Sequence, residues 1–104
     1  MPDFLFAYHG GTIPETQQEG EKAMAAWGQW FADMGEAVVN GGNPVGQSMT
    51  VTSAGVSDTG GTNPISGYTV VRAETAEAAC AIAAGCPMVA DGSGSVEVAP
   101  LIEM

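Results

Sequence analysis

The single histidine of the chain, His9, is the residue best suited to proton transfer. Imidazole titrates close to neutral pH, which suits it to general acid–base catalysis. His9 lies at the end of a predicted strand, directly before the Gly10-Gly11 pair that ends it. We therefore take His9 as a candidate acid–base residue. The alternative is a structural histidine that is hydrogen-bonded at the end of its strand.

A second group of residues could form the walls of a ligand pocket. Trp27 and Trp30 carry large apolar rings with a polar N–H group, so each either packs in the core or stacks on a flat ligand. Tyr8 and Tyr68 lie on predicted strands, and each hydroxyl belongs either in a cleft or to a hydrogen bond of the core. The predicted ligand-binding residues are Tyr8, Trp30, Asn43 and Tyr68, with Asn43 as a polar group at the rim.

Several kinds of functional site lack the residues that they require. One histidine without a nearby pair of carboxylates is not a metal-coordinating set, so we predict no metal site. No GxSxG elbow, no GxGxxG after a strand and no phosphate-binding GxxxxGK[ST] loop is present, which argues against a serine hydrolase and against nucleotide binding. We predict no cofactor. Cys80 and Cys86 do not have the spacing of a zinc site, and we expect two buried, unpaired thiols.

The charge balance excludes polyanionic partners. The 104 residues include 12 acidic and 2 basic side chains, for a formal net charge of −10. Lys22 and Arg72 cannot displace the counterions of a nucleic acid or an anionic membrane, so neither is expected as a partner. The 45% apolar content nevertheless predicts a folded domain, one over residues 1–104. Without a membrane-length apolar run or a basic leader at its start, the chain is expected in the cytoplasm.

These candidates depend on the elements that carry them. Residues 3–9 form a predicted strand whose two faces are both largely apolar. Thr16 with Glu19 fits a capping box at the start of a helix, Thr12 with Glu15 is a competing start, and Gly35 is suited to end the helix. Apolar residues recur along this helix at steps of three and four: Met24, Trp27, Trp30, Phe31 and Met34.

The rest of the chain alternates strands, loops and one more helix. Further strands are predicted over 37–39, 47–53, 67–73 and 95–102, with the first two paired as a hairpin. A second helix is predicted over 77–84 behind an N-cap at Thr75. Loops are expected over 54–66 and 88–94.

This order predicts an α+β fold of the ferredoxin-like, split βαβ type. Its two helices would cover one face of the sheet, yet Leu5 and Ala7 of the first strand also need a cover. The simplest cover is a second copy packed sheet to sheet, so we predict a homodimer.

Six short motifs also resemble a known family. In chain order they are Tyr8-His9-Gly10-Gly11, Trp27-Gly-Gln-Trp30-Phe31, Gly42-Asn43-Pro44, Gly67-Tyr68-Thr69, Cys86-Pro87-Met88 and Gly94-Ser95-Val96-Glu97-Val98. Together they resemble the YCII-related proteins, close to the DGPF-type branch. The resemblance implies a ferredoxin-like domain that dimerises into an α/β barrel. It implies little about activity, because the family's biochemical function is largely unestablished.

The chain departs from this family at two places. The Asp-Gly-Pro-Phe motif is absent, and Thr62-Asn63-Pro64-Ile65 takes its place. The resemblance to the founding branch implies a His–Asp pair with the His on the first helix. The Asp position matches Asp33, while the His position falls near Met24. Asp33 is thus a candidate catalytic residue by resemblance, although a thioether cannot serve as its basic partner. The alternative is that Asp33, which lies off the apolar stripe of the helix, is a solvated surface carboxylate.

Two hypotheses about function follow. The first is a small-molecule-binding protein with a pocket near His9 and the first helix, and with weak acid–base catalysis by His9. The second is a non-catalytic regulatory or protein-interaction module, whose acidic surface would require a partner with a basic patch.

Overall fold

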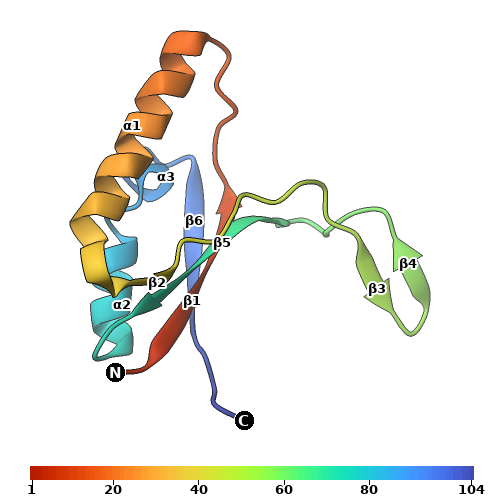
Figure 1. Ribbon diagram of the computed structural model, residues 1–104. Helices are drawn as coiled ribbons and strands as arrows, with labels where there is room; N and C mark the ends of the chain where they lie inside the picture. Colours follow the sequence, from red (N-terminus) through yellow and green to blue (C-terminus); the bar gives the residue numbers. More distant parts are fainter.

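A computed structural model describes all 104 residues. It contains a four-stranded antiparallel sheet of order β2-β5-β1-β6, with the helices on one face (Figure 1). The elements are β1 (Asp3–Gly10), α1 (Gln17–Met34), the 3-10 turn η1 (Gly35–Ala37), β2 (Val38–Asn40), β3 (Thr50–Thr52), β4 (Gly55–Ser57), β5 (Ile65–Arg72), α2 (Ala76–Ala83), α3 (Pro87–Ala90) and β6 (Gly94–Pro100). The predicted α+β fold is confirmed, and none of the helices is both long and apolar enough to cross a membrane.

Strand β1 lies between β5 and β6. Phe4, Phe6 and Tyr8 are buried on the face that the helices cover. Alternate residues point the opposite way, and residues directly across the ladders share their face. We call this second face the open face; its residues are Leu5, Ala7, His9, Tyr68, Val70, Glu97 and Ala99. No element of the chain packs over it (Figure 1).

Helix α1 begins and ends where its caps predict. The Thr16 hydroxyl accepts a hydrogen bond from the Glu19 N–H at 3.1 Å, and Gly35 ends the helix with a φ of 55°. Of the predicted apolar stripe, Trp30 is buried and Trp27 packs against the core. Met24 is 77% exposed, so its place in the stripe was wrong. It lies in the N-terminal half of α1, which extends beyond the sheet and has little to pack against (Figure 1).

The core joins β1 to both longer helices. The Trp30 ring stacks on Phe6 with centroids 6.2 Å apart, and its Nε1–H donates to the Ile82 carbonyl at 3.1 Å. Thr75 caps α2 as predicted. The two cysteines differ: Cys86 is buried, but Cys80 is exposed, which corrects the expectation of two buried thiols. The neighbour of Cys80, Ala79, is the fully buried residue of this turn, so Cys80 lies off the buried face of α2.

Strand pairing differs from the prediction around residues 38–57. Strand β2 pairs with β5, where Val38 lies opposite Val71, and not with β3. Strand β3 pairs instead with β4, which lies inside the predicted loop 54–66. Short-range alternation predicts a strand but not its partner. The turn at Ser53-Ala54, followed by Gly55 with a φ of 131°, gives β3 a nearer partner than β2. The predicted loop 88–94 also overlaps α3, a single helical turn that begins at Pro87.

The β3–β4 hairpin forms an arm over residues 47–62. Figure 1 shows that it projects away from the sheet, on the side opposite the helices. Its valines Val51 and Val56 are 74% and 62% exposed, and Asp58 is its single charged residue. An isolated two-stranded hairpin is marginally stable in water. The arm therefore presents apolar surface that this chain alone does not cover.

Candidate functional site

A cavity of about 1190 Å³ lies beside α1, on the face of the sheet that the helices cover. We call it the α1 cavity. Its lining comes from five segments: the end of β1 with the loop after it, one face of α1, the loop over 41–44, β5 over 66–69, and residues 87–93. Loop 41–44 is held against β5 because the Asn43 carbonyl accepts a hydrogen bond from the Tyr68 N–H at 3.2 Å.

Three aromatic side chains form one wall of the α1 cavity. The rings of Tyr8 and Trp27 meet edge to face, with centroids 5.2 Å apart and an interplanar angle of 85°. Phe31 lies beside Trp27 at 6.4 Å. Such contacts hold the rings in place while Trp27 and Phe31 stay only partly buried. The wall is thus a preformed surface on which a flat or cationic group can pack.

The Tyr8 hydroxyl is part of a hydrogen-bond chain. It donates to Thr69 Oγ1 at 2.7 Å, and the Thr69 hydroxyl in turn donates to the Gly41 carbonyl at 3.0 Å. Burial raises the pKa of Tyr8 to about 12, so the phenol is neutral at physiological pH. Its proton is committed to Thr69, which leaves the Tyr8 oxygen able to accept a hydrogen bond.

Ser66, another lining residue, carries an unmet hydrogen bond. Its Oγ is buried and has no partner in the chain. Buried hydroxyls are nearly always hydrogen-bonded, so an orphan one requires an explanation. Because this oxygen is closed to solvent, a buried water is the partner that fits it without movement of the lining.

The charged residues of the lining are mostly acidic. Glu15, Glu19 and Asp91 contribute carboxylates, and Lys22 contributes one ammonium group. The Asp91 carboxylate accepts a hydrogen bond from the Ser93 N–H at 2.8 Å, which lowers the pKa of Asp91 and keeps it ionised. The Glu19 carboxylate accepts from the Glu15 N–H at 3.0 Å.

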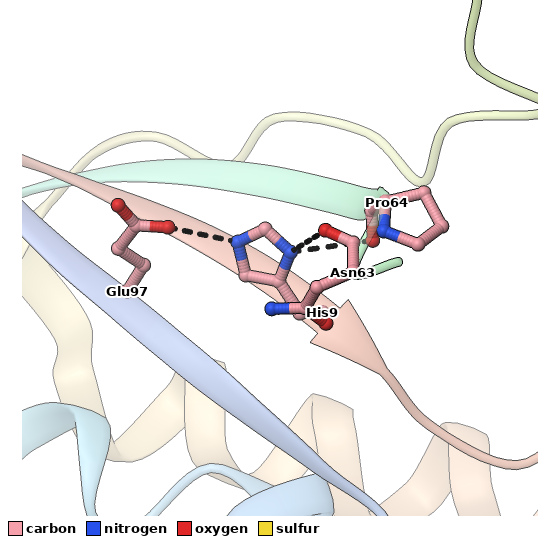
Figure 2. Close-up of polar contacts among 4 residues, drawn as sticks. All are labelled: His9, Asn63, Pro64 and Glu97. Atoms are coloured by element: carbon pink, nitrogen blue, oxygen red, sulfur yellow. Dashed lines mark hydrogen bonds and ion pairs between the residues drawn. The ribbon is translucent and has the colours of Figure 1, made fainter. Parts of the chain in front are cut away.

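His9 lies on the open face and does not line the α1 cavity. Figure 2 shows its ring between Glu97 of β6 and the backbone where the arm returns to β5. Its Nε2 is 3.0 Å from Glu97 Oε1, and its Nδ1 is 3.0 Å from the Asn63 carbonyl and 3.2 Å from that of Pro64. All of these partners are acceptors. The ring makes both sets of hydrogen bonds only when both of its nitrogens carry a proton.

The predicted site residues thus fall into separate places. Tyr8 and Asn43 line the α1 cavity. Tyr68 borders it where β5 meets loop 41–44, although its place opposite Ala7 puts it on the open face of the sheet. Trp30, which was expected to line the pocket, lies in the core and is 6% exposed. Trp27 lines the α1 cavity in its place. Asp33 is exposed on α1, where it accepts a hydrogen bond from the Gln29 amide at 2.8 Å, beside a shallower hollow of about 530 Å³.

Other functional residues carried no signal in the sequence. Phe31 was identified as part of the helix stripe but not as a cavity residue. Ser66 had no distinguishing neighbour, because its orphan hydroxyl results from long-range packing of β5. Glu97 stood out only as a polar residue of the last strand, and its pairing with His9 joins residues 88 positions apart.

Comparisons with known proteins place the fold. No protein-family model and no curated protein matches the chain. Its fold is similar to that of 5-chloro-2-hydroxyhydroquinone dehydrochlorinase (TftG) from Burkholderia phenoliruptrix AC1100, solved in complex with 2,5-dihydroxybenzoquinone. The TM-score is 0.59 at 14% sequence identity, over 98% of this chain and 95% of the other. At this identity the similarity concerns the fold alone, and it extends over nearly the whole of both chains.

Proposed function

We propose that the chain binds a small planar molecule in the α1 cavity. The observation that carries this proposal is the aromatic wall of Tyr8, Trp27 and Phe31 in a cavity of about 1190 Å³. Ligand sites typically combine apolar walls with a few converging polar groups, in volumes of roughly 300–1,000 Å³. The similarity to a dehydrochlorinase solved with a small ring compound supports the same class of ligand.

We also assign acid–base chemistry to His9, on the open face and apart from the ligand of the α1 cavity. In a single copy of the chain its side chain is 12% exposed while that of Glu97 is 70% exposed, so water reaches the pair from the Glu97 side. An imidazole between a carboxylate and backbone carbonyls is held in one orientation, as a general acid must be. Asp33 has only the Gln29 amide as a partner, which makes it the weaker acid–base candidate.

Ligand binding in the α1 cavity should therefore not depend on the His9 side chain. A flat ligand from a library of neutral and cationic small molecules, with 2,5-dihydroxybenzoquinone included, is expected to raise the melting temperature of the wild type. At one hundred times its Kd, it adds about 2.7 kcal/mol to the free energy of unfolding. His9→Ala should keep this rise because His9 lies on the other face, whereas Trp27→Ala should lose it because the aromatic wall is gone.

Met24→Ala is the matched control for Trp27→Ala. Met24 is a large side chain on the same helix, exposed and outside the α1 cavity. Thermal unfolding followed by circular dichroism measures all four proteins. A ligand whose effect survives Trp27→Ala binds elsewhere, and the absence of any rise across the library would contradict the proposal.

We also propose that the chain is a cytoplasmic YCII-related protein whose second copy covers the open face, in the manner of a dimeric α/β barrel. The six motifs in order support the family, and the similarity in fold agrees with it. Leu5, Ala7 and Val70 give the open face an apolar centre. The arm projects on the same side, so a copy packed on the open face would also meet Val51 and Val56 (Figure 1).

If this assembly forms, a charged residue placed on the open face or on the arm should dissociate the dimer. At micromolar concentration the wild type should sediment as a species of twice the 10.5 kDa chain mass. Val70→Asp on the open face and Val51→Asp on the arm should shift it toward 10.5 kDa, since an apolar contact does not accept an unpaired carboxylate. Val51 is exposed, so its variant should fold normally. Met24→Asp, on α1, should leave the dimer intact, and a wild type that sediments at 10.5 kDa would refute the assembly.

A further inference from the structure

The charges around the α1 cavity are unbalanced. Three carboxylates, those of Glu15, Glu19 and Asp91, share the lining with a single ammonium group, that of Lys22. The whole chain carries a formal charge of −10, so no distant basic region offsets them. A cleft lined by one sign of charge concentrates ligands of the opposite sign. The electrostatic field at this cavity thus favours cations.

The N-terminus of α1, which lines the same cavity, does not reverse this preference. Free N–H groups at a helix N-terminus attract anions. Here the Glu19 N–H already donates to the Thr16 hydroxyl, and the Glu19 carboxylate accepts from the Glu15 N–H just before the helix. One helix N–H is therefore capped, and a carboxylate of the chain itself stands at this helix end, which repels an anionic ligand.

The aromatic wall supplies short-range recognition of a cation. A cation over the face of an indole is attracted by the ring quadrupole, and tryptophan is the strongest of the three aromatic residues in this role. Trp27 stands between Tyr8 and Phe31 and remains partly exposed. The neutral Tyr8 oxygen, whose proton is donated to Thr69, can accept a hydrogen bond from an ammonium N–H.

From these observations we infer that the α1 cavity selects a small organic cation, an arylalkylammonium in its simplest form, over neutral and anionic analogues of the same shape. This inference rests on the proposed binding of small molecules in the α1 cavity and names the charge class of the ligand. The ammonium group lies against the indole and the acidic lining, while the apolar part of the ligand packs on the remaining aromatic wall.

Three probes of matched shape test the charge class: 2-phenylethylammonium, 2-phenylethanol and phenylacetate. Titration by calorimetry at low and at physiological ionic strength gives each Kd. The cation should bind about tenfold more tightly than the alcohol. Phenylacetate should bind more weakly than either, and added salt should weaken only the cation's binding appreciably.

Two variants separate charge from shape. Glu15→Gln with Asp91→Asn removes two carboxylates from the lining, and the asparagine oxygen can still accept from the Ser93 N–H. This double variant should weaken binding of the cation by roughly fivefold and leave that of the alcohol unchanged. Glu36→Gln removes an exposed carboxylate outside the cavity and should change neither.

The outcomes distinguish this inference from the proposal beneath it. If the alcohol binds as tightly as the cation, or phenylacetate binds best, the charge class is wrong while binding in the α1 cavity stands. If the double variant binds the cation as the wild type does, the acidic lining has no role and the inference is overturned. If none of the probes binds and the library also gives no stabilisation, both the inference and the proposed function are wrong.

Discussion

Replacing Gly42 with alanine should reduce the free energy of unfolding by about 3 kcal/mol or more. Gly42 has a φ of +69°, a left-handed conformation that alone costs an L-residue roughly 1–2 kcal/mol. An added Cβ would also lie 1.8 Å from the Tyr68 carbonyl oxygen, far inside contact distance. That carbonyl belongs to β5, which is paired with the central strand β1 and cannot easily move. Loop 41–44 therefore has to move away from β5.

The neighbouring glycine provides the control. A Cβ on Gly41 would meet nothing within 4 Å, and its φ is not positive. Gly41→Ala should therefore change stability by only a few tenths of a kcal/mol, of either sign, as compatible Gly→Ala changes do. Urea unfolding of both variants measures the difference. Equal midpoints for the two would contradict the strained, close approach of Gly42 to β5.

Gly42→Ala should also reduce ligand affinity. Gly42 and Asn43 line the α1 cavity, and the Tyr68 N–H donates to the Asn43 carbonyl. Displacing loop 41–44 breaks that bond and opens the wall it holds.

The second large effect is expected at the centre of the core. Phe6→Ala should cost about 3–5 kcal/mol, the usual range for a large aromatic residue truncated in a core. Phe6 is 0% exposed and stacks on Trp30, so its removal leaves a cavity between β1 and α1. Because a domain of this kind is stable by only about 5–15 kcal/mol, the variant should be close to unfolding at 37 °C.

Val56→Ala is the control for this change. Val56 is 62% exposed on the arm, and its truncation should alter the stability of the isolated chain by less than about 0.5 kcal/mol. Urea unfolding gives the loss of stability, and the near-ultraviolet circular dichroism of Trp30 reports whether the native packing remains. A loss below 1 kcal/mol for Phe6→Ala would show that this core has relaxed around the change, against its close-packed arrangement.

Short-range patterns were sufficient for the individual elements. The caps at Thr16 and Thr75 and the end at Gly35 depend on hydrogen bonds between residues three or four positions apart, so the sequence shows both partners at once. The alternation in β1 likewise placed Phe6 and Tyr8 on one face and Leu5 and His9 on the other. Each of these effects acts within a few residues.

The arrangement of strands was only partly predictable. The strand β1 is central, but its two apolar faces bear on what covers the sheet and not on which strands flank it. The partner of β2 did not follow, because Val38 pairs with Val71 across more than thirty intervening residues, which include the arm. Alternation in residues 50–52 was read correctly as a strand but paired with the wrong neighbour.

The site shows most clearly what the sequence by itself determined and what only the tertiary structure decided. Alternation in the sequence already placed Tyr8 and His9 on opposite faces of the sheet. Only the position of the helices shows that Tyr8 lines the α1 cavity and that His9 does not. Likewise, the composition established an acidic chain, and the fold gathered three of its carboxylates around one aromatic wall. Caps and alternation are local interactions, whereas a cavity is formed by segments far apart in the chain, whose meeting depends on the packing of the whole domain.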